Sequence, residues 1–233
     1  MTLPTPTTVP EPIEPPNADA EARRAMAWTH TARFLTTASA LHELPPTELA
    51  EIAFVGRSNA GKSTAINTLA QQKRLAFASK TPGRTQHINL FELGPKLAPD
   101  TLFADLPGYG YAAVERTAKL RWQRVMADYL EVRRSLSAIV MLVDSRLGFT
   151  PLDLQLLEFI GPRIDSGAVK LLVLLTKADK HGKAAMAAAL RTTEATLSAS
   201  TSASADVSVA SFSALSRAGV ADAAIWLHRS VHS

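Results

Sequence analysis

The sequence contains no cysteine and no long hydrophobic run. The absence of cysteine excludes disulfides, thiolate metal sites and cysteine nucleophiles. A membrane-spanning helix needs roughly 20 consecutive apolar residues, whereas the longest apolar runs, residues 138–143 and 171–175, have the length of buried strands. The first residues also lack the basic start and the apolar stretch of a signal peptide. We therefore expect a cytoplasmic protein without a membrane segment.

The first 21 residues contain no lysine or arginine, but they contain four acids. Because this stretch is also rich in proline and poor in large apolar groups, residues 1–20 are predicted to be a disordered acidic tail that precedes a single domain over residues 21–233. The chain carries a net charge of +4, and outside the first 21 residues 17 acids stand against 25 bases. A basic domain favours a polyanionic partner such as RNA, although a solvated basic surface has the same composition.

One stretch follows the phosphate-binding pattern G-x-x-x-x-G-K-[ST], known as a P-loop. An apolar segment at residues 52–55 precedes it and a helical pattern over residues 64–70 follows it, as the motif requires. Glycines allow successive N–H groups to point at one phosphate cluster, and the helix N-terminus adds the positive end of its dipole. The lysine reaches phosphate oxygens, and the last hydroxyl ligates Mg²⁺. The stretch consists of Gly56, Arg57, Ser58, Asn59, Ala60, Gly61, Lys62 and Ser63.

Apolar strands alternate with helical patterns along most of the chain. Strands are predicted at residues 52–55, 87–93, 102–104, 138–144, 170–176 and 206–212, and helices at residues 21–29, 64–70, 114–134, 150–164, 182–199 and 217–231. Residues 32–44 are mixed and receive no element. Continuous apolar strands between helices are typical of an α/β fold, in which helices cover both faces of a mostly parallel sheet. Ligands of such folds bind at the carboxyl ends of the strands.

Three further loops follow strands at this edge of the sheet. Residues 105–108 contain an aspartate that can bind Mg²⁺ through a water and a glycine whose N–H can bond the γ-phosphate. In residues 176–179 a carboxylate can accept from guanine N1–H and the amino group, which adenine cannot offer, and a lysine stem can lie along the purine. In residues 212–214, the small serine and alanine let backbone N–H groups approach guanine O6. These loops predict a guanine nucleotide site formed by Asp105, Leu106, Pro107, Gly108, Thr176, Lys177, Ala178, Asp179, Phe212, Ser213 and Ala214.

Five stretches, including T-P-G-R-T-Q at residues 81–86, resemble those of the EngB (YihA/YsxC) family of bacterial GTPases. The run D-L-P-G-Y-G-Y-A from Asp105, and Thr176 where most GTP-binding proteins have asparagine, separate this family from its relatives. The resemblance extends from about residue 32 to the C-terminus. It implies a Ras-like P-loop GTPase with a six-stranded sheet, Mg²⁺ dependence and a role in assembling the large ribosomal subunit, with cell division affected when the protein is lost.

The resemblance also assigns residues in the basic loop that follows the P-loop helix. Chemistry alone leaves Thr81 and Thr85 as the source of the second Mg²⁺ hydroxyl, and the resemblance favours Thr85. The implied metal ligands are then Ser63, Thr85 and, through a water, Asp105. Related GTPases use an asparagine at the position of Asn59 to hold K⁺, so stimulation by potassium is expected. The other nucleotide contacts implied here are Gly83, Arg84, Gln86 and His87.

The expected chemistry is in-line attack of a water on the γ-phosphate. Tyr109 stands where Ras-type proteins have a glutamine that orients this water, and a phenol cannot donate to and accept from the water as an amide does. Intrinsic hydrolysis is therefore expected to be slow. Arg57 and Arg84 are candidates for an arginine finger, or else they are solvated or face RNA. The predicted catalytic residues, which stabilise charge on the transferring group directly or through Mg²⁺, are Lys62, Thr85 and Gly108.

The sequence leaves three purposes open. The first is a regulatory GTPase that binds an assembling ribosome in the GTP state and leaves after hydrolysis. The second, a metabolic enzyme that transfers phosphate to a small molecule, is disfavoured because the chain shows no second domain or lid. The third is a GTP-dependent RNA-binding scaffold with negligible turnover. Residues 73–84 and 116–134 are basic and are the candidate contacts to ribosomal RNA, and a monomer is the default.

Overall fold

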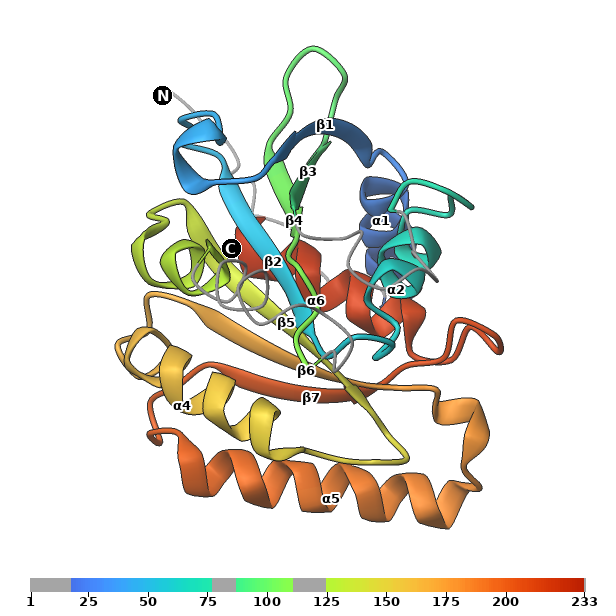
Figure 1. Ribbon diagram of the computed structural model, residues 1–233. Helices are drawn as coiled ribbons and strands as arrows, with labels where there is room; N and C mark the ends of the chain where they lie inside the picture. Colours follow the sequence, from blue (N-terminus) through green and yellow to red (C-terminus); the bar gives the residue numbers. More distant parts are fainter. Residues whose placement is uncertain (1–17, 77–86, 111–124, 233) are drawn as a thin grey trace, which may run out of the picture.

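A seven-stranded β-sheet forms the centre of the part of the chain that the structure describes (Figure 1). The computed structural model describes residues 18–76, 87–110 and 125–232. The strands are β1 (Arg33–Ala38), β2 (Ala50–Gly56), β3 (Ile88–Leu93), β4 (Thr101–Asp105), β5 (Leu136–Asp144), β6 (Lys170–Thr176) and β7 (Val207–Ser211). Their order across the sheet is β1-β3-β4-β2-β5-β6-β7. β4, β2, β5, β6 and β7 are parallel to one another, while β3 is antiparallel to β4 and to β1.

The sheet has one strand more than the six that were expected, and the additional strand is β1. Residues 32–44 show no period-two pattern, because Phe34 and Leu35 are neighbours and both are exposed, at 56% and 39%. β1 lies at the edge of the sheet, pairs there with β3, and shifts register between Phe34 and Thr36. An edge strand with a bulge need not bury alternate residues, so its hydrophobic pattern does not reveal it.

Helices cover both faces of the sheet (Figure 1). Alternate residues of β2 divide between two cores, since Ala53 and Val55 join one and Ile52 and Phe54 join the other. The first core is closed by α4, α5 and the helical residues 125–132, and the second by α1, α2 and α6. The prediction of a mostly parallel α/β sheet covered on both faces is confirmed. The helix bounds are α1 (Ala18–Thr29), α2 (Lys62–Leu69), α4 (Pro151–Asp165), α5 (Lys183–Ser200) and α6 (Val220–His232).

The predicted bounds of the buried strands agree with the structure to within two residues. β6 spans Lys170–Thr176 as predicted, and β5 begins at Leu136, two residues before the predicted start. Of the helix predicted over residues 114–134, the structure describes residues 125–134, and the helix ends at residue 132. α1 begins at Ala18, so residues 18–20 belong to a helix and not to the predicted tail, whose residues 1–17 lie outside the described part.

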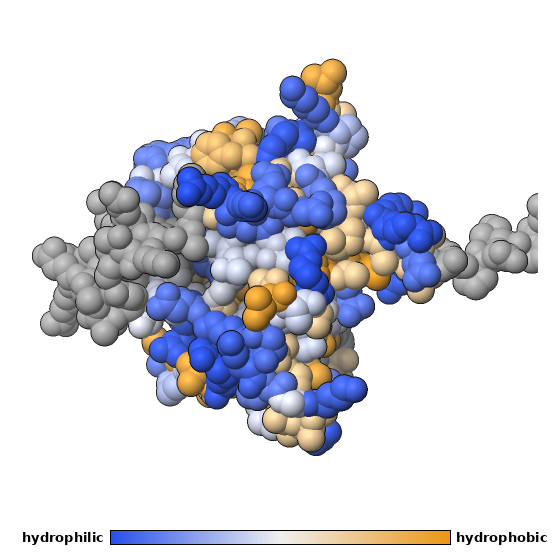
Figure 2. Space-filling model, turned by 90° about the vertical axis from the view of Figure 1, so that its right-hand side faces the viewer, coloured by the Kyte–Doolittle hydropathy of each residue, from blue (hydrophilic) through white to orange (hydrophobic). Residues whose placement is uncertain are grey.

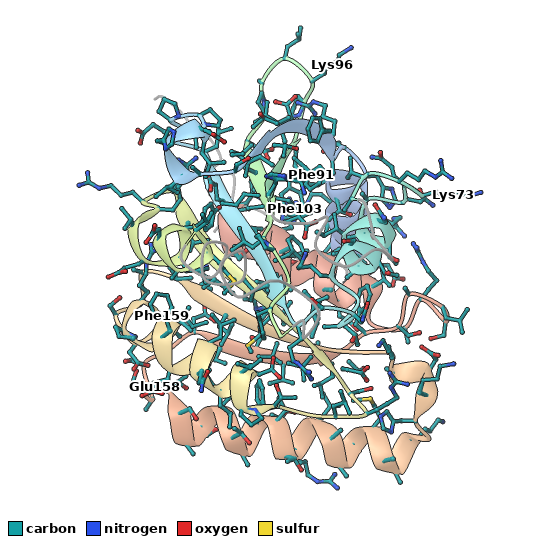
Figure 3. The ribbon with its side chains drawn as sticks, in the orientation of Figure 1. Lys73, Phe91, Lys96, Phe103, Glu158 and Phe159 are labelled. Carbon is teal, nitrogen blue, oxygen red and sulfur yellow. The ribbon has the colours of Figure 1, made fainter. Side chains whose placement is uncertain are left out.

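The turn between β3 and β4 projects from the top of the molecule in Figure 1. The same projection stands at the top of Figure 2, where hydrophilic residues predominate over the face that is shown. Figure 3 places Lys96 at the tip of this turn and Phe91 and Phe103 in the interior, at paired positions of β3 and β4. None of the helices in the described part of the chain is long and apolar enough to cross a membrane.

Candidate nucleotide-binding site

The predicted loops leave the sheet at one edge, where the parallel strands end together. Phe54 of β2 lies opposite Asp105, the last residue of β4. Asp144, the last residue of β5, lies opposite Thr176, the last residue of β6. The loops after β2, β4, β5 and β6 therefore start side by side, as expected for a ligand site in an open α/β sheet.

The P-loop joins β2 directly to α2. α2 begins at Lys62, and the Ala65 N–H donates to the Gly61 carbonyl at 2.8 Å. Two P-loop residues have left-handed backbones, Asn59 with φ of 68° and Gly61 with φ of 98°. Side chains are strained at such angles, which explains the glycine immediately before Lys62. The turn therefore ends at the N-terminus of α2, the part of a helix that the P-loop pattern predicts will face phosphate.

Lys62 and Asp105 form a buried ion pair between the P-loop and the end of β4. The Lys62 side chain is 8% exposed and the Asp105 side chain is fully buried. Burying either charge alone would be costly, so each stabilises the other in this state. The two residues that the sequence assigned to phosphate and to Mg²⁺ are therefore brought into contact.

The residues around this ion pair fit a magnesium ion. Asp105 Oδ1 accepts from Lys62, while Oδ2 is buried and has no hydrogen-bond partner among the described residues. The hydroxyl-bearing residue Ser63 follows Lys62 in the first turn of α2. Mg²⁺ takes oxygen ligands and keeps several waters, so one hydroxyl and one carboxylate that acts through water suit it. A buried orphan oxygen in this place is what a metal-bound water would satisfy.

The loop after β4 lies directly on the P-loop. The Ser58 N–H donates to the Tyr109 carbonyl at 2.8 Å, and the Tyr109 N–H donates to the Gly56 carbonyl at 3.3 Å. Between them, a side chain at Gly108 would come within 3.2 Å of the Ser58 nitrogen. Glycine therefore favours this close approach of two backbones, and Gly108 lies directly against Ser58 of the P-loop.

Tyr109 points away from this loop and toward α4. Its hydroxyl donates to Asp153 Oδ1 at 2.6 Å, and the residue is buried. Burial, and then the neighbouring Asp153 charge, hold the pKa of the Tyr109 hydroxyl well above its ordinary value. Asp153 also accepts from the Thr150 N–H at 2.8 Å and from the Thr150 hydroxyl at 2.6 Å, which caps α4. The phenol is thus a neutral, fixed donor to a helix cap.

The predicted guanine loop, residues 176–179, is attached to the P-loop through two side chains. The Thr176 hydroxyl lies 2.6 Å from the Ala60 carbonyl and 3.2 Å from the Val143 carbonyl. The Lys177 ammonium donates to the Asn59 carbonyl at 2.9 Å. A hydroxyl supplies the bond to the P-loop that position 176 needs, which gives a physical reason why threonine serves there in place of the usual asparagine.

Asp179 is fixed by the loop after β7. The Ser213 hydroxyl donates to Asp179 Oδ1 at 2.7 Å, and the Ala178 N–H donates to the Phe212 carbonyl at 3.2 Å. The bond from Ser213 is the largest cause that holds the pKa of Asp179 below its ordinary value, so the carboxylate is charged at neutral pH. A charged carboxylate is the acceptor that a guanine edge requires. Residues 178–179 and 212–213 are therefore brought together.

Several predicted contacts lie outside the described residues, namely Gly83, Arg84, Thr85 and Gln86. His87 is described, and its Nδ1 lies 2.8 Å from the Ser39 hydroxyl, beyond the end of β1. This bond gives the His87 ring a partner outside the phosphate loops. The assignment of these five residues to the nucleotide remains a prediction.

Two carboxylates at this site were not assigned a role from the sequence, Asp144 and Asp153. Asp153 falls three residues after Thr150, a spacing typical of a helix cap, but its bond to Tyr109 spans 44 residues and leaves no local signal. Both line a pocket of about 210 Å³ between the P-loop and the β5–α4 loop, together with Arg57, Asn59, Arg146 and Lys177. Arg57 Nε is buried there without a hydrogen-bond partner among the described residues.

The fold and these loops define an α/β P-loop GTPase. A family model described as "50S ribosome-binding GTPase" matches residues 51–177. A probable GTP-binding protein EngB of Acidovorax ebreus is 58% identical over 207 residues, which cover 89% of this chain and 91% of that protein. The chain belongs to the EngB family of GTP-binding proteins. A second relative, probable GTP-binding protein EngB of Burkholderia thailandensis, is 48% identical over 83% of this chain and 88% of its own length.

Solved structures show the same fold at lower identity. A crystal structure of a probable GTP-binding protein engB superposes with a TM-score of 0.59 and 20% identity, and the match covers 78% of this chain and 98% of that one. Era in complex with MgGDPNP and nucleotides 1506–1542 of 16S ribosomal RNA has a TM-score of 0.63 and 21% identity, with 81% of this chain and 58% of the Era chain covered. The prediction of an EngB-type α/β GTPase is confirmed.

Proposed function

We propose that this GTPase binds GTP with Mg²⁺ at the P-loop, hydrolyses it slowly, and acts as a switch in the assembly of the large ribosomal subunit. Normal cell division and septation would then depend on it. The description of the matching family as ribosome-binding supports the ribosomal part. The bond from Tyr109 to Asp153 is the observation that carries the slow rate.

The phosphates of GTP would compete with Asp105 for the Lys62 ammonium group. In the proposed GTP state Lys62 leaves Asp105 and binds the β- and γ-phosphate oxygens. Asp105 then accepts from a water, and the hydroxyls of Ser63 and Thr85 provide the direct protein ligands. Bound Mg²⁺ supplies neutralisation of charge on the β- and γ-phosphates. Gly108 offers its N–H to the γ-phosphate from a position that the close contact with Ser58 supports.

The slow rate of hydrolysis follows from the hydrogen bond that the Tyr109 hydroxyl makes. The hydroxyl donates to Asp153 and is buried, and the neutral phenol has no basic lone pair to activate a water. No other residue in the loop after β4 and before residue 111 offers an amide or carboxylate side chain to this water. Hydrolysis then depends on groups that a partner supplies or rearranges, as in GTPases whose activators add charge in trans.

A potassium ion is proposed as an additional activator beside Asn59. The left-handed backbone of Asn59 and the contact of its carbonyl with Lys177 fix this residue next to the phosphate loop. Hydrolysis should be faster in potassium than in sodium buffer at equal ionic strength. Equal rates in the two buffers would remove potassium from the proposal.

Exposed bases within residues 73–84 and 116–134 are the proposed contacts to ribosomal RNA. Lys73 extends away from the molecule in Figure 3, and Arg74 and Arg134 are exposed as well. Arg133, in contrast, donates to the buried carboxylate of Glu51 at 2.6 Å and to the Pro45 carbonyl at 2.8 Å, so its role is structural. Binding through phosphate contacts should weaken steeply as salt is raised.

The proposal is tested by GTP hydrolysis with and without purified large ribosomal subunits. We expect the rate to rise by at least roughly tenfold with large subunits, and not with small subunits. Replacing Lys73 and Arg74 by alanine should reduce this stimulation, whereas Arg191→Ala, which removes an exposed base from α5, should not. No stimulation by either subunit would contradict the switch.

The second candidate function is a GTP-dependent RNA-binding scaffold with negligible turnover. The engagement of Tyr109 with Asp153 favours it too, because nothing in that bond requires turnover. A scaffold would bind large subunits more tightly with GTP than with GDP, but its hydrolysis would stay at the intrinsic rate in their presence. The same assay therefore separates the two functions.

A further inference from the structure

Asp144 receives more hydrogen bonds than its position on a strand end requires. The Arg146 side chain donates to both carboxylate oxygens, with Nε 2.9 Å from Oδ1 and Nη2 2.7 Å from Oδ2. The Arg146 N–H donates to Oδ1 at 3.1 Å, and Lys177 Nζ donates to Oδ2 at 2.7 Å. Two cations from two different loops thus meet on one carboxylate.

The strand register explains why Asp144 reaches Lys177. Asp144 lies directly opposite Thr176, the last residue of the neighbouring strand, and Lys177 follows Thr176. Lys177 has a left-handed backbone with φ of 59°, which turns its side chain back across the sheet edge. Its ammonium ends between the Asp144 carboxylate and the Asn59 carbonyl of the P-loop. Asp144 is therefore the charged partner that holds this ammonium against the P-loop.

The local turn does not need the carboxylate. The backbone of Asp144 already accepts from the N–H groups of Leu147 at 2.9 Å and Gly148 at 3.1 Å, and the Ser145 N–H donates to the Thr176 carbonyl at 3.1 Å. Arg146 is half exposed, and ion pairs with such groups contribute little to folding. The four bonds to the Asp144 side chain are thus better explained by what they position than by the stability of the loop.

We propose that Asp144 is a positioning residue for guanine nucleotide binding, which fixes Lys177 so that its stem lies along the purine and its ammonium supports the P-loop at Asn59. Arg146 restrains Asp144 from the solvent side. The hydrogen bond from Arg146, followed by the one from Lys177, keeps the pKa of Asp144 well below its ordinary value, so the carboxylate stays charged. This inference rests on the proposed nucleotide site.

The test is a double-mutant cycle on nucleotide binding by the full chain. Lys177→Ala and Asp144→Ala are each expected to weaken binding of a fluorescent GDP analogue by roughly tenfold, the value of a charged hydrogen bond. If Asp144 acts through Lys177, the double variant should bind as weakly as Lys177→Ala alone. Multiplied losses in the double variant would overturn the proposal.

A second readout separates positioning from base reading. Because the Lys177 stem contacts the purine face and not its edge, Asp144→Ala should weaken guanosine and inosine diphosphates by the same factor. A changed ratio would contradict the proposal. Arg146→Ala should cost less than Asp144→Ala, since the bond from Lys177 to Asp144 survives. If Asp144→Ala does not fold, Asp144→Asn can be measured in its place, and it should also weaken nucleotide binding.

Glu158→Gln provides the matched control. Glu158 is an exposed carboxylate on α4 and points outward in Figure 3, so the same chemical change there should leave binding unaltered. Failure of the inference and failure of the proposed site give different results. If Lys177→Ala has no effect, the nucleotide site itself is wrongly placed. If Lys177→Ala weakens binding and both Asp144 variants do not, only the inference is overturned.

Discussion

Two lysine–carboxylate pairs border the P-loop, and they differ in burial and in the number of their bonds. Lys62 and Asp105 are both buried, and one oxygen of Asp105 has no partner among the described residues. Lys177 and Asp144 are partly exposed, and both oxygens of Asp144 are engaged. A buried pair with an unsatisfied atom is suited to an exchange of partners when phosphate and metal arrive. A saturated pair at the surface is suited to remain unchanged.

In the proposed function, this difference divides the site into a phosphate side that rearranges and a base side that is preformed. The base side is fixed by bonds from Thr176, Lys177 and Ser213, none of which has to break for guanine to bind. On the phosphate side, the Lys62–Asp105 pair has to open before Lys62 can bind phosphate. A switch needs this combination, because the nucleotide is held by one half while the γ-phosphate changes the other.

The largest expected effect is on the base side. Asp179→Asn replaces the acceptor of guanine N1–H by an amide, which suits xanthine better. The ratio of guanine to xanthine nucleotide affinities should fall by roughly 10⁴-fold, as for other sites built on buried polar pairs. Competition between GTP and XTP for the protein measures this ratio. An unchanged preference for GTP would mean that residues 176–179 do not read the base.

The next effect is on the phosphate side. Lys62→Met removes the ammonium that stabilises the transferring phosphate, so hydrolysis should fall by roughly a hundred- to a thousandfold. It also leaves Asp105 buried without its partner, which should cost about 3–5 kcal/mol of stability. Single-turnover hydrolysis and urea unfolding measure the two losses. Adding Asp105→Asn should recover part of the stability and none of the activity, whereas no recovery would show that the two charges do not stabilise each other.

A smaller effect is expected at the hydrogen bond between Tyr109 and Asp153 of α4. Tyr109→Phe deletes the hydroxyl that donates to Asp153, while the backbone bonds of residue 109 to the P-loop persist. Loss of this buried bond should destabilise the protein by about 1–3 kcal/mol, as measured by urea unfolding, and should not lower intrinsic hydrolysis. A large loss of hydrolysis would instead make the phenol catalytic.

The smallest effect concerns the stability that the Lys177–Asp144 pair contributes and its dependence on pH. The folded-state pKa of Asp144 is depressed, so its contribution to stability is complete above the unfolded pKa of about 3.9 and is lost as the pH falls through the lower folded value. The free energy of unfolding of the unsubstituted protein should therefore exceed that of the Asp144→Asn variant by a constant amount between about pH 5 and 8.

That amount should stay below about 1 kcal/mol, because Arg146 is half exposed, and it should shrink below about pH 4. Urea titrations of both proteins across this range provide the measurement. A difference that grows as the pH falls would contradict the assigned pKa direction.

Much of this site was predictable because motifs place residues by chain order. The P-loop, Asp105 and the loops after β6 and β7 each follow an apolar strand, and parallel strands deliver their loops to one edge. The same logic explains the limits of the sequence. β1 was missed because Phe34 and Leu35 break the alternation that marks a strand, and its place at the sheet edge allows this.

The roles of Asp144, Asp153 and Arg133 depend on partners that are distant in the sequence. Asp144 meets Lys177 33 residues away, and Arg133 meets Glu51 82 residues away. In the sequence Arg133 is one more base of a basic helix, and only packing shows that it is paired with a buried carboxylate. Likewise, the sequence shows only that Tyr109 replaces a glutamine, whereas the structure shows that its hydroxyl donates to Asp153.

The most direct test of the division between the two sides is a crystal structure of this protein with Mg²⁺ and a non-hydrolysable GTP analogue. We predict that Lys62 will lie on the phosphate oxygens, that Asp105 will face a metal-bound water, and that Lys177 will keep its bonds to Asp144 and to the Asn59 carbonyl. A complex in which Lys62 stays on Asp105, or in which Lys177 leaves Asp144, would contradict the account.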